Sequence, residues 1–274
     1  MRQELNNLNK LRAVEIDILN KVVAVCEKHN LKYYLAYGTL IGAIRHKGFI
    51  PWDDDIDIWM FREDYDKFAE IAQKDLGDKY FYQDRNTDKE YPYHFAKVKA
   101  NGTELIQSST RNLKIHNGIY IDIFPLDKAP SEEHLDEYIK QIRELKSKSE
   151  WIYGYKERGR FKALCYKMLR KSFYYKSIHN KIEKTMKKFN NTSREYYRYN
   201  FGYNKLYITK ADFGDGILVD FENTKYIVPS NYDKPLTQVY GDYMKLPPED
   251  KQVSNHDNLN VDFGEYFKED NLNR

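Results

Sequence analysis

The sequence predicts an α+β fold, in which helices flank a mixed β-sheet and a basic, mainly helical segment is added to this core. Apolar residues recur every three or four positions over residues 3–30, which is the period of an amphipathic helix. They alternate with acidic or polar residues over 55–61 and 119–124, as in strands with one buried face. Residues 143–198 contain 17 Lys and Arg but 5 Asp and Glu, whereas the rest of the chain is acidic.

The first half of the chain is predicted to alternate between helix and strand. The first helix presents an apolar stripe that includes Leu11, Val14 and Ile18. Glycine at the end of the next apolar run favours a turn into a short helix. The elements expected here are helices over 3–30, 40–45 and 62–76, and strands over 33–37, 55–61, 81–83, 95–99, 104–106 and 119–124.

The second half is predicted to be richer in helix. Ser131 is a suitable N-cap for a helix that runs to Ser149, with two glutamates in its first turn. The basic segment is expected to be helical in two or three pieces, joined at Gly154, Gly159 and near Ser177. A hairpin over 217–228 and a loop-like tail after Tyr243 complete the chain. We divide it into a core (1–142), a basic helical subdomain (143–200) and a C-terminal part that returns to the core (201–274).

Composition excludes several classes of protein. A chain of 274 residues that is 41% hydrophobic and 15% aromatic can bury a core, which argues against disorder. No apolar run approaches the roughly 18–20 residues of a membrane-spanning helix, and the first residues lack the apolar region of a signal peptide. Cys26 and Cys165 are too few for a disulfide framework or an all-cysteine zinc site. We therefore expect a soluble, cytoplasmic protein.

Aspartates gather in one short stretch, at Asp53, Asp54, Asp55 and Asp57. Because strand side chains alternate, Asp55 and Asp57 are expected on one face, about 6.5–7 Å apart at the backbone. Such charges repel unless a cation lies among them, and Mg²⁺ or Mn²⁺ prefers oxygen ligands. Asp122 interrupts another apolar strand, where burying it alone would be costly. Asp55, Asp57 and Asp122 therefore predict a metal site for phosphoryl transfer.

Three other interpretations of the acidic cluster compete with this one. An EF-hand loop needs glycine at its sixth position and glutamate at its twelfth, where this chain has Ile58 and Asp64. A solvated acidic turn does not explain the apolar residues Ile56 and Ile58. The third, a metal-dependent glycosyltransferase with a D-x-D site, stays open. For the protein as a whole, a non-enzymatic module that binds anionic membranes stays open as well.

A phosphate site is predicted upstream of the aspartates. Gly38-Thr39 lies at a strand-to-helix turn, where glycine lets the backbone approach a ligand and free N–H groups attract phosphate. Asp55 follows Thr39 by 16 residues, a spacing that resembles the layout of the nucleotidyltransferase fold. Arg45, His46 and Lys47 either add cationic contacts to a diphosphate or form an ordinary exposed loop.

Longer motifs carry a resemblance to a known family. Residues 38–45 read Gly-Thr-Leu-Ile-Gly-Ala-Ile-Arg, and residues 48–57 read Gly-Phe-Ile-Pro-Trp-Asp-Asp-Asp-Ile-Asp. Ile-Asp-Ile-Phe-Pro at 121–125, Val228-Pro229, and Tyr-Gly-Asp-Tyr-Met-Lys-Leu-Pro-Pro at 240–248 add shorter matches. Together these motifs resemble the LicD family over most of the chain.

The resemblance implies a nucleotidyltransferase-like core and a transferase activity. Members of the LicD family, and of the related fukutin group, move a phosphorylated alcohol from a CDP-activated donor to a glycan hydroxyl. It further implies that Asp55, Asp57 and Asp122 hold Mg²⁺ or Mn²⁺, with Asp53 as a nearby acidic residue of the catalytic set. The zinc-binding cysteines of some animal relatives have no counterpart in this sequence.

We therefore expect a phosphotransferase that carries phosphocholine from CDP-choline to a lipid-linked cell-wall glycan such as a teichoic acid precursor, with release of CMP. Either Asp53 or Asp122 takes the hydroxyl proton. Lys97 and Lys99 are candidate phosphate contacts, and Trp52 is a candidate aromatic contact for a quaternary ammonium. No nucleic acid is expected as a partner, because no recognised binding module is present.

The basic segment predicts a second kind of contact. Lysine and arginine clusters favour anionic membranes, and interleaved apolar residues are typical of an interfacial helix. We therefore expect residues 143–198 to meet the inner face of the cell membrane or an anionic acceptor. The residues assigned to this surface are Arg158, Arg160, Lys162, Lys167, Arg170 and Lys171, with Phe161, Leu164, Leu169, Phe173 and Tyr174.

Overall fold

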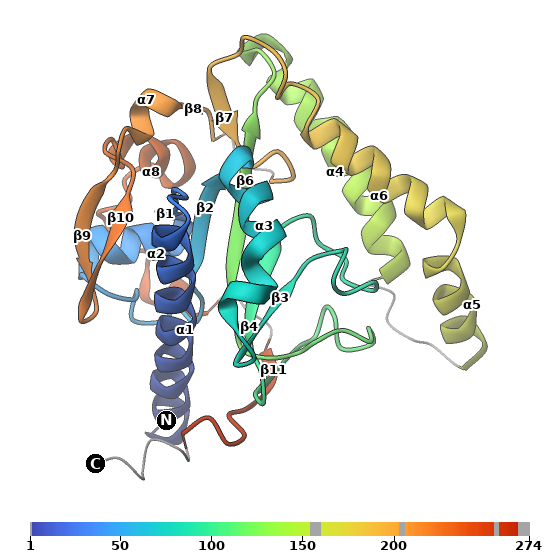
Figure 1. Ribbon diagram of the computed structural model, residues 1–274, viewed down its shortest axis with the longest axis horizontal. Coiled ribbons are helices and arrows are strands. Elements are labelled where there is room, and N and C mark those ends of the chain that lie inside the picture. The colour runs from blue at the N-terminus through green and yellow to red at the C-terminus, as the bar shows by residue number, and fades with distance from the viewer. Residues whose placement is uncertain (1, 154–159, 203–205, 255–257, 268–274) are drawn as a thin grey trace.

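The computed structural model describes residues 2–153, 160–202, 206–254 and 258–267. A mixed sheet of seven strands occupies its centre, and helices pack around it (Figure 1). Five strands follow the order β1-β2-β6-β4-β3, while β7 and β8 extend the sheet from the end of β6. Strands β2 and β6 run parallel, and the other neighbours run antiparallel. The predicted α+β class is confirmed.

The strands of this sheet are mostly short. They are β1 (Tyr34–Leu35), β2 (Asp57–Phe61), β3 (Tyr80–Gln83), β4 (Ala96–Ala100), β6 (Tyr120–Lys128), β7 (Tyr196–Arg198) and β8 (Ile208–Thr209). The prediction that β2 starts at Asp55 is wrong by two residues. Its loop diverges before Asp57 because Arg12 of the first helix binds the loop's carbonyl groups, so the ladder with β1 and β6 starts later.

Two helices, α1 (Arg2–Lys28) and α3 (Arg62–Leu76), cover one face of the sheet (Figure 1). Phe68 of α3 packs on Tyr82, with ring centroids 6.0 Å apart. Tyr82 is in register with Val98, and Val98 with Ile121, so the helix-covered face is the apolar one. Because strand side chains alternate, Asp122 points to the opposite face, which carries the site described below.

Three helices form a projection that we call the arm. They are α4 (Leu135–Tyr153), α5 (Arg160–Arg170) and α6 (Phe173–Met186), preceded by a 3₁₀ turn (Glu132–His134). Helices α4 and α6 pack together, and α5 lies at their outer end, away from the sheet (Figure 1). The predicted break near Ser177 is wrong: it falls at Ser172, whose hydroxyl accepts from the Tyr175 N–H and caps α6. Gly154 and Gly159 lie outside the described residues.

Buried histidines join the arm to the core. The ring of His179 on α6 lies 2.8 Å (Nδ1) from Nε2 of His94 and 3.1 Å (Nε2) from the hydroxyl of Ser149 on α4. Burial, Arg85 and His94 lower the pKa of His179 to about 2, so this ring is neutral. The contact is therefore a chain of neutral hydrogen bonds, which holds α4 and α6 against the segment before β4.

The C-terminal part contains more structure than predicted. Besides the expected hairpin of β9 (Ile217–Phe221) and β10 (Thr224–Val228), it has α7 (Lys210–Phe213), α8 (Asp233–Tyr240) and a 3₁₀ turn (Glu249–Lys251). The tail expected to be a loop contains β11 (Asn258–Asp262), which pairs with β5 (Glu104–Gln107). Among the described residues, no helix combines the length and apolar character that crossing a bilayer requires.

Candidate active site

One row of polar side chains crosses three neighbouring strands. Asp57 of β2 is in register with Asp122 of β6, and Asp122 is in register with Lys97 of β4. Residues directly opposite each other on adjacent strands project to the same face. The sequence placed the two aspartates on separate strands, and the sheet order makes them neighbours.

Lys97 and Asp122 form an ion pair with 2.5 Å between Nζ and Oδ1. Both residues are almost fully buried, and the Lys97 ammonium also lies 3.3 Å from the ring centroid of Tyr120. Burial lowers the pKa of Lys97, and the charge and hydrogen bond of Asp122 act against that shift. A buried pair of this kind is costly to break, because removing one partner leaves an uncompensated charge.

Burial and the neighbouring carboxylates change the pKa of Asp57. Burial, and then the charges of Asp55, Asp122 and Asp53, raise its pKa well above the ordinary value, while Lys97 acts in the opposite direction. The carboxylates also act on Tyr240 of α8. Although 43% of this residue is exposed, burial of its phenol, followed by charges that include those of Asp57, Asp53 and Asp55, raises its pKa. The site therefore concentrates more negative charge than Lys97 offsets.

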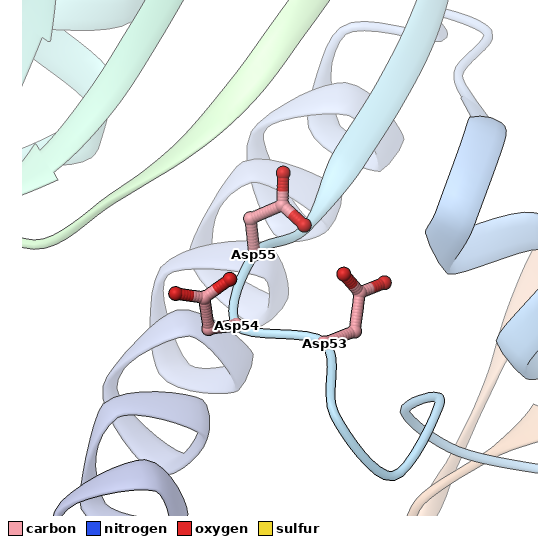
Figure 2. A group of neighbouring side chains, drawn as sticks. All are labelled: Asp53, Asp54 and Asp55. Atoms are coloured by element: carbon pink, nitrogen blue, oxygen red, sulfur yellow. The ribbon is translucent and has the colours of Figure 1, made fainter. Parts of the chain in front are cut away.

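The loop that leads into β2 carries the other carboxylates beside α1 (Figure 2). Oxygens of Asp53, Asp54 and Asp55 lie within 4.8 Å of one another. Asp54 accepts hydrogen bonds from Ser254 (2.6 Å) and Asn258 (2.8 Å) at its two oxygens, so it anchors the C-terminal tail to the loop. Asp53 and Asp55 thus differ from Asp54, which is committed to a structural contact.

A clamp from α1 shapes this loop, and the sequence did not reveal it. The guanidinium of Arg12 donates to the carbonyl oxygens of Ile50 (2.8 Å), Pro51 (3.0 Å) and Asp53 (2.7 Å), and it lies 4.8 Å from the Phe49 ring centroid. The signal for Arg12 was weak, because its partners lie about 40 residues away. Its position directly after Leu11 on the predicted apolar stripe was the one local hint.

Glu15, one turn after Arg12, is a second residue that the sequence did not reveal. It is 1% exposed, and burial followed by the charges of Asp55, Asp54 and Asp53 raises its pKa well above the ordinary value. Glu15 therefore favours its neutral form beside the loop. A charged residue next to Val14 on the buried stripe was again the available signal.

The turn predicted to bind phosphate holds the aspartates in place. A Cβ on Gly38 would lie 2.7 Å from Oδ2 of Asp53, so any other residue here would push that carboxylate out of its present place. The buried hydroxyl of Thr39 accepts a hydrogen bond from the Asp57 N–H (2.8 Å) at the start of β2. Both residues lie in the first turn of α2 (Tyr37–Ile41), where N–H groups have no intrahelical partner.

The basic residues after α2 are engaged mainly with the protein itself. They lie in and after a π-helical turn (Gly42–His46). Arg45 donates to the carbonyl oxygens of Tyr243 (2.5 Å) and Lys245 (3.4 Å) and to Nε2 of His46 (2.9 Å). Burial and Arg45 lower the pKa of His46. Lys47 is exposed in a left-handed conformation. Arg45 thus links the first motif to the late one at residues 240–248.

Lys99 and Trp52 lie at the margin of the site. Lys99 is buried two residues after Lys97 on β4, so the two side chains project from the same face of the sheet. Its ammonium donates to the His116 carbonyl (2.6 Å). Burial, followed by the charge of Lys97, lowers the pKa of Lys99 to about 7. Trp52 is half-buried against the core next to Asp53.

The donor set suits a hard divalent cation. Asp55, Asp57 and Asp122 all offer carboxylate oxygens, and the raised pKa of Asp57 reports first its burial and then the repulsion between these carboxylates. A cation among them would relieve that repulsion, and oxygen-only donors fit Mg²⁺ or Mn²⁺. The neighbouring Lys97 neutralises only one of the charges.

Comparison with known proteins identifies the family. A family model described as "LicD/FKTN/FKRP, nucleotidyltransferase domain" matches residues 30–163. Over 260 residues the chain is 32% identical to the "Lipopolysaccharide cholinephosphotransferase LicD" of Haemophilus influenzae, which covers 91% of this chain and 96% of that protein. The chain belongs to the LicD family. The resemblance drawn from its motifs is confirmed, and its α+β structure is consistent with a nucleotidyltransferase-like LicD fold.

Other relatives of this LicD-family chain match shorter stretches. The "Ribitol 5-phosphate transferase FKRP" of mouse and of human is 38% identical over 56 residues, which is 20% of this chain and 11% of those proteins. An uncharacterized protein of Rickettsia prowazekii is 29% identical over 127 residues, or 46% of this chain and 44% of that protein. Like the Haemophilus influenzae protein, FKRP is named as a transferase.

Proposed function

We propose that this LicD-family protein transfers phosphocholine from CDP-choline to a hydroxyl group of a cell-surface glycan precursor, such as teichoic acid, and releases CMP. The reaction requires Mg²⁺ or Mn²⁺. The observation that carries the proposal is the row of Asp57, Asp122 and Lys97 in a chain 32% identical to a cholinephosphotransferase along nearly its whole length.

Each residue of the row has a part in binding the donor. Asp55, Asp57 and Asp122 hold the metal ion, which when bound offsets the negative charge of the diphosphate. Lys97 orients Asp122 through their ion pair and presents its remaining N–H groups to the phosphates. The first turn of α2, at Gly38 and Thr39, supplies backbone N–H groups to the same diphosphate.

Other contacts complete the proposed donor site. Lys99 lies beside Lys97 and is a second phosphate contact. Trp52 offers an aromatic face to the quaternary ammonium of choline. Arg45 and His46 keep the late motif against the site, because their hydrogen bonds run within the protein. Lys47 is left as an exposed contact for the nucleotide.

The chemical step is an in-line displacement at phosphorus. The acceptor oxygen forms a bond to the phosphorus that bears choline, and the bond from that phosphorus to the bridging oxygen breaks. CMP leaves with the bridging oxygen. The proton of the acceptor hydroxyl passes to Asp53, because Asp122 is already engaged in its ion pair with Lys97.

The acceptor and the location follow from the same proposal. A cell-wall glycan precursor is made on a lipid carrier at the inner face of the cell membrane, so we place the enzyme in the cytoplasm, close to that surface. The proposal needs no nucleic acid.

A donor panel tests the proposed function. The purified protein is incubated with Mg²⁺ and, separately, CDP-choline, CDP-ethanolamine, CDP-ribitol or UDP-glucose, and the released nucleotide is measured. Release of CMP, fastest from CDP-choline and abolished by chelation of the metal, is the expected result. Turnover of UDP-glucose alone would support the D-x-D glycosyltransferase instead, and release of no nucleotide with any donor and a glycan acceptor would overturn the proposal.

A further inference from the structure

Helix α5 at the outer end of the arm carries an exposed stripe that the active site does not use. Leu164, Lys167 and Met168 follow at spacings of three and four residues, so they share one side of the helix, and Lys171 comes directly after its last residue. All four are exposed, with Leu164 at 55% and Met168 at 66%. The side chains of Arg158, Arg160, Phe161 and Lys162, which the sequence also assigned to this surface, lie outside those described.

The opposite side of α5 faces the protein. Leu169 packs against the core, Tyr166 contacts Trp151 of α4 with ring centroids 5.3 Å apart, and Arg170 lies 4.0 Å from Glu90. Leu169 and Arg170, expected from the sequence to face a membrane, therefore point inward. Met168, which the sequence did not single out, takes their place on the outer stripe.

Apolar exposure continues at the corner between α5 and α6. Phe173 is 85% exposed and Tyr174 is 56% exposed. Tyr174 also lines a groove of about 550 Å³ between α4 and α6, whose other lining residues include Trp151, the basic Arg143 and Lys148, and the acidic Glu144. Single exposed apolar residues are common, but a run of them between lysines marks an interaction surface.

We propose that this surface, made of Leu164, Lys167, Met168, Lys171, Phe173 and Tyr174, docks the protein on an anionic lipid bilayer. The apolar side chains enter the boundary between headgroups and acyl chains, and the lysines reach the negatively charged headgroups along their flexible stems. Charge selects this occupant, because an excess of basic residues over the whole arm would be attracted to anionic lipid. The position of α5 at the outer end of the arm leaves it accessible to a flat surface (Figure 1).

This inference goes beyond the proposed function and does not depend on it, since binding is measured without turnover. The full chain is sedimented with vesicles of phosphatidylcholine alone or mixed with phosphatidylglycerol. We expect binding to the mixed vesicles only, weakened by high salt. Changing Lys167 and Lys171 to Gln should weaken binding roughly thirtyfold, from about 1 kcal/mol for each basic residue near the surface.

Matched variants separate docking from general surface effects. L164S/M168S should lose binding by more than roughly tenfold, because the apolar side chains no longer enter the bilayer. Leu218→Ser on β9, which removes an equally exposed apolar residue (63%), should bind as the wild type does. Lys67→Gln with Lys74→Gln on α3 serves as the matched charge control, since both lysines are exposed.

A probe on Cys165 reports the orientation directly. This thiol is exposed between Leu164 and Tyr166, whereas Cys26 is buried and its pKa is raised by burial, so labelling is selective. A polarity-sensitive fluorophore there should shift to shorter wavelength on mixed vesicles. Equal binding to both kinds of vesicle, an unshifted probe on bound protein, or equal losses in the α3 and β9 controls would overturn the proposal, as would capture by an acidic protein without any binding to lipid.

Discussion

Replacing Arg12 with Met should release the loop that carries the aspartates. The guanidinium donates to three carbonyl oxygens, of Ile50, Pro51 and Asp53, at 2.7–3.1 Å. Hydrogen bonds from a charged donor contribute about 1.5–3 kcal/mol each, and the exposed one to Pro51 contributes little. The stacking of Arg12 on Phe49 adds about 0.5–1 kcal/mol. Because water replaces part of these contacts, we expect Arg12→Met to lower the free energy of unfolding by about 2–4 kcal/mol.

Urea denaturation followed by circular dichroism measures this loss, and metal titration of the activity measures the effect on the site. Arg12→Lys is the matched variant. It keeps the charge but not the planar guanidinium with its fixed set of N–H donors, so it should be intermediate in stability. The metal concentration for half-maximal activity should rise in Arg12→Met, because the loop carrying Asp55 is no longer held. A loss below about 0.5 kcal/mol, with an unchanged metal requirement, would refute the clamp.

Three further predictions follow from buried or crowded groups. Lys99 is neutral in the fold above about pH 7, whereas the unfolded chain keeps this proton up to about pH 10.4. Raising the pH from 7 to 9 should therefore increase the free energy of unfolding of the wild type by about 2 kcal/mol more than that of Lys99→Met. A pH-independent difference would contradict the lowered pKa. Gly38→Ala should cost roughly tenfold or more in activity with the circular dichroism spectrum retained, since its Cβ displaces the Asp53 carboxylate; full activity would contradict this crowding. The Arg62 guanidinium lies 2.7 Å from the fully buried carboxylate of Asp127, so Arg62→Met should leave that charge without its partner and cost about 3–5 kcal/mol in urea denaturation. Adding Asp127→Asn should restore part of that loss.

The central part of the fold could be predicted because its signals are local. Alternation in residues 55–61 and 119–124 shows which side chains share a face, and the acidic residues stand out against the isoleucines. The short strands β7, β8 and β11 could not be predicted in this way, since two or three residues carry no period and β11 pairs with a strand about 150 residues away. Their positions depend on tertiary contacts.

In the candidate site too, residues with a local signal could be predicted and residues that depend on distant partners could not. Residues 53–57 and Asp122 were singled out from their own surroundings, and their roles as metal ligands stay predictions. The partners that shape them were not visible locally: Arg12 reaches across about 40 residues, and Ser254 and Asn258 reach Asp54 across about 200. Arg45 illustrates the converse, because a basic residue in a phosphate-binding context binds backbone carbonyls instead.

The most direct test of the central claim compares two neighbouring aspartates. Asp55→Asn and Asp54→Asn remove the same charge from adjacent positions on one loop (Figure 2). CMP release from CDP-choline is measured at saturating Mg²⁺ for both variants, with circular dichroism to confirm the fold. We predict that Asp55→Asn loses more than roughly a hundredfold in rate. Asp54→Asn should stay within about threefold of the wild type, because Asp54 anchors the tail. Retention of more than about a tenth of the wild-type rate in Asp55→Asn, or equal losses in both, would contradict the proposed metal site.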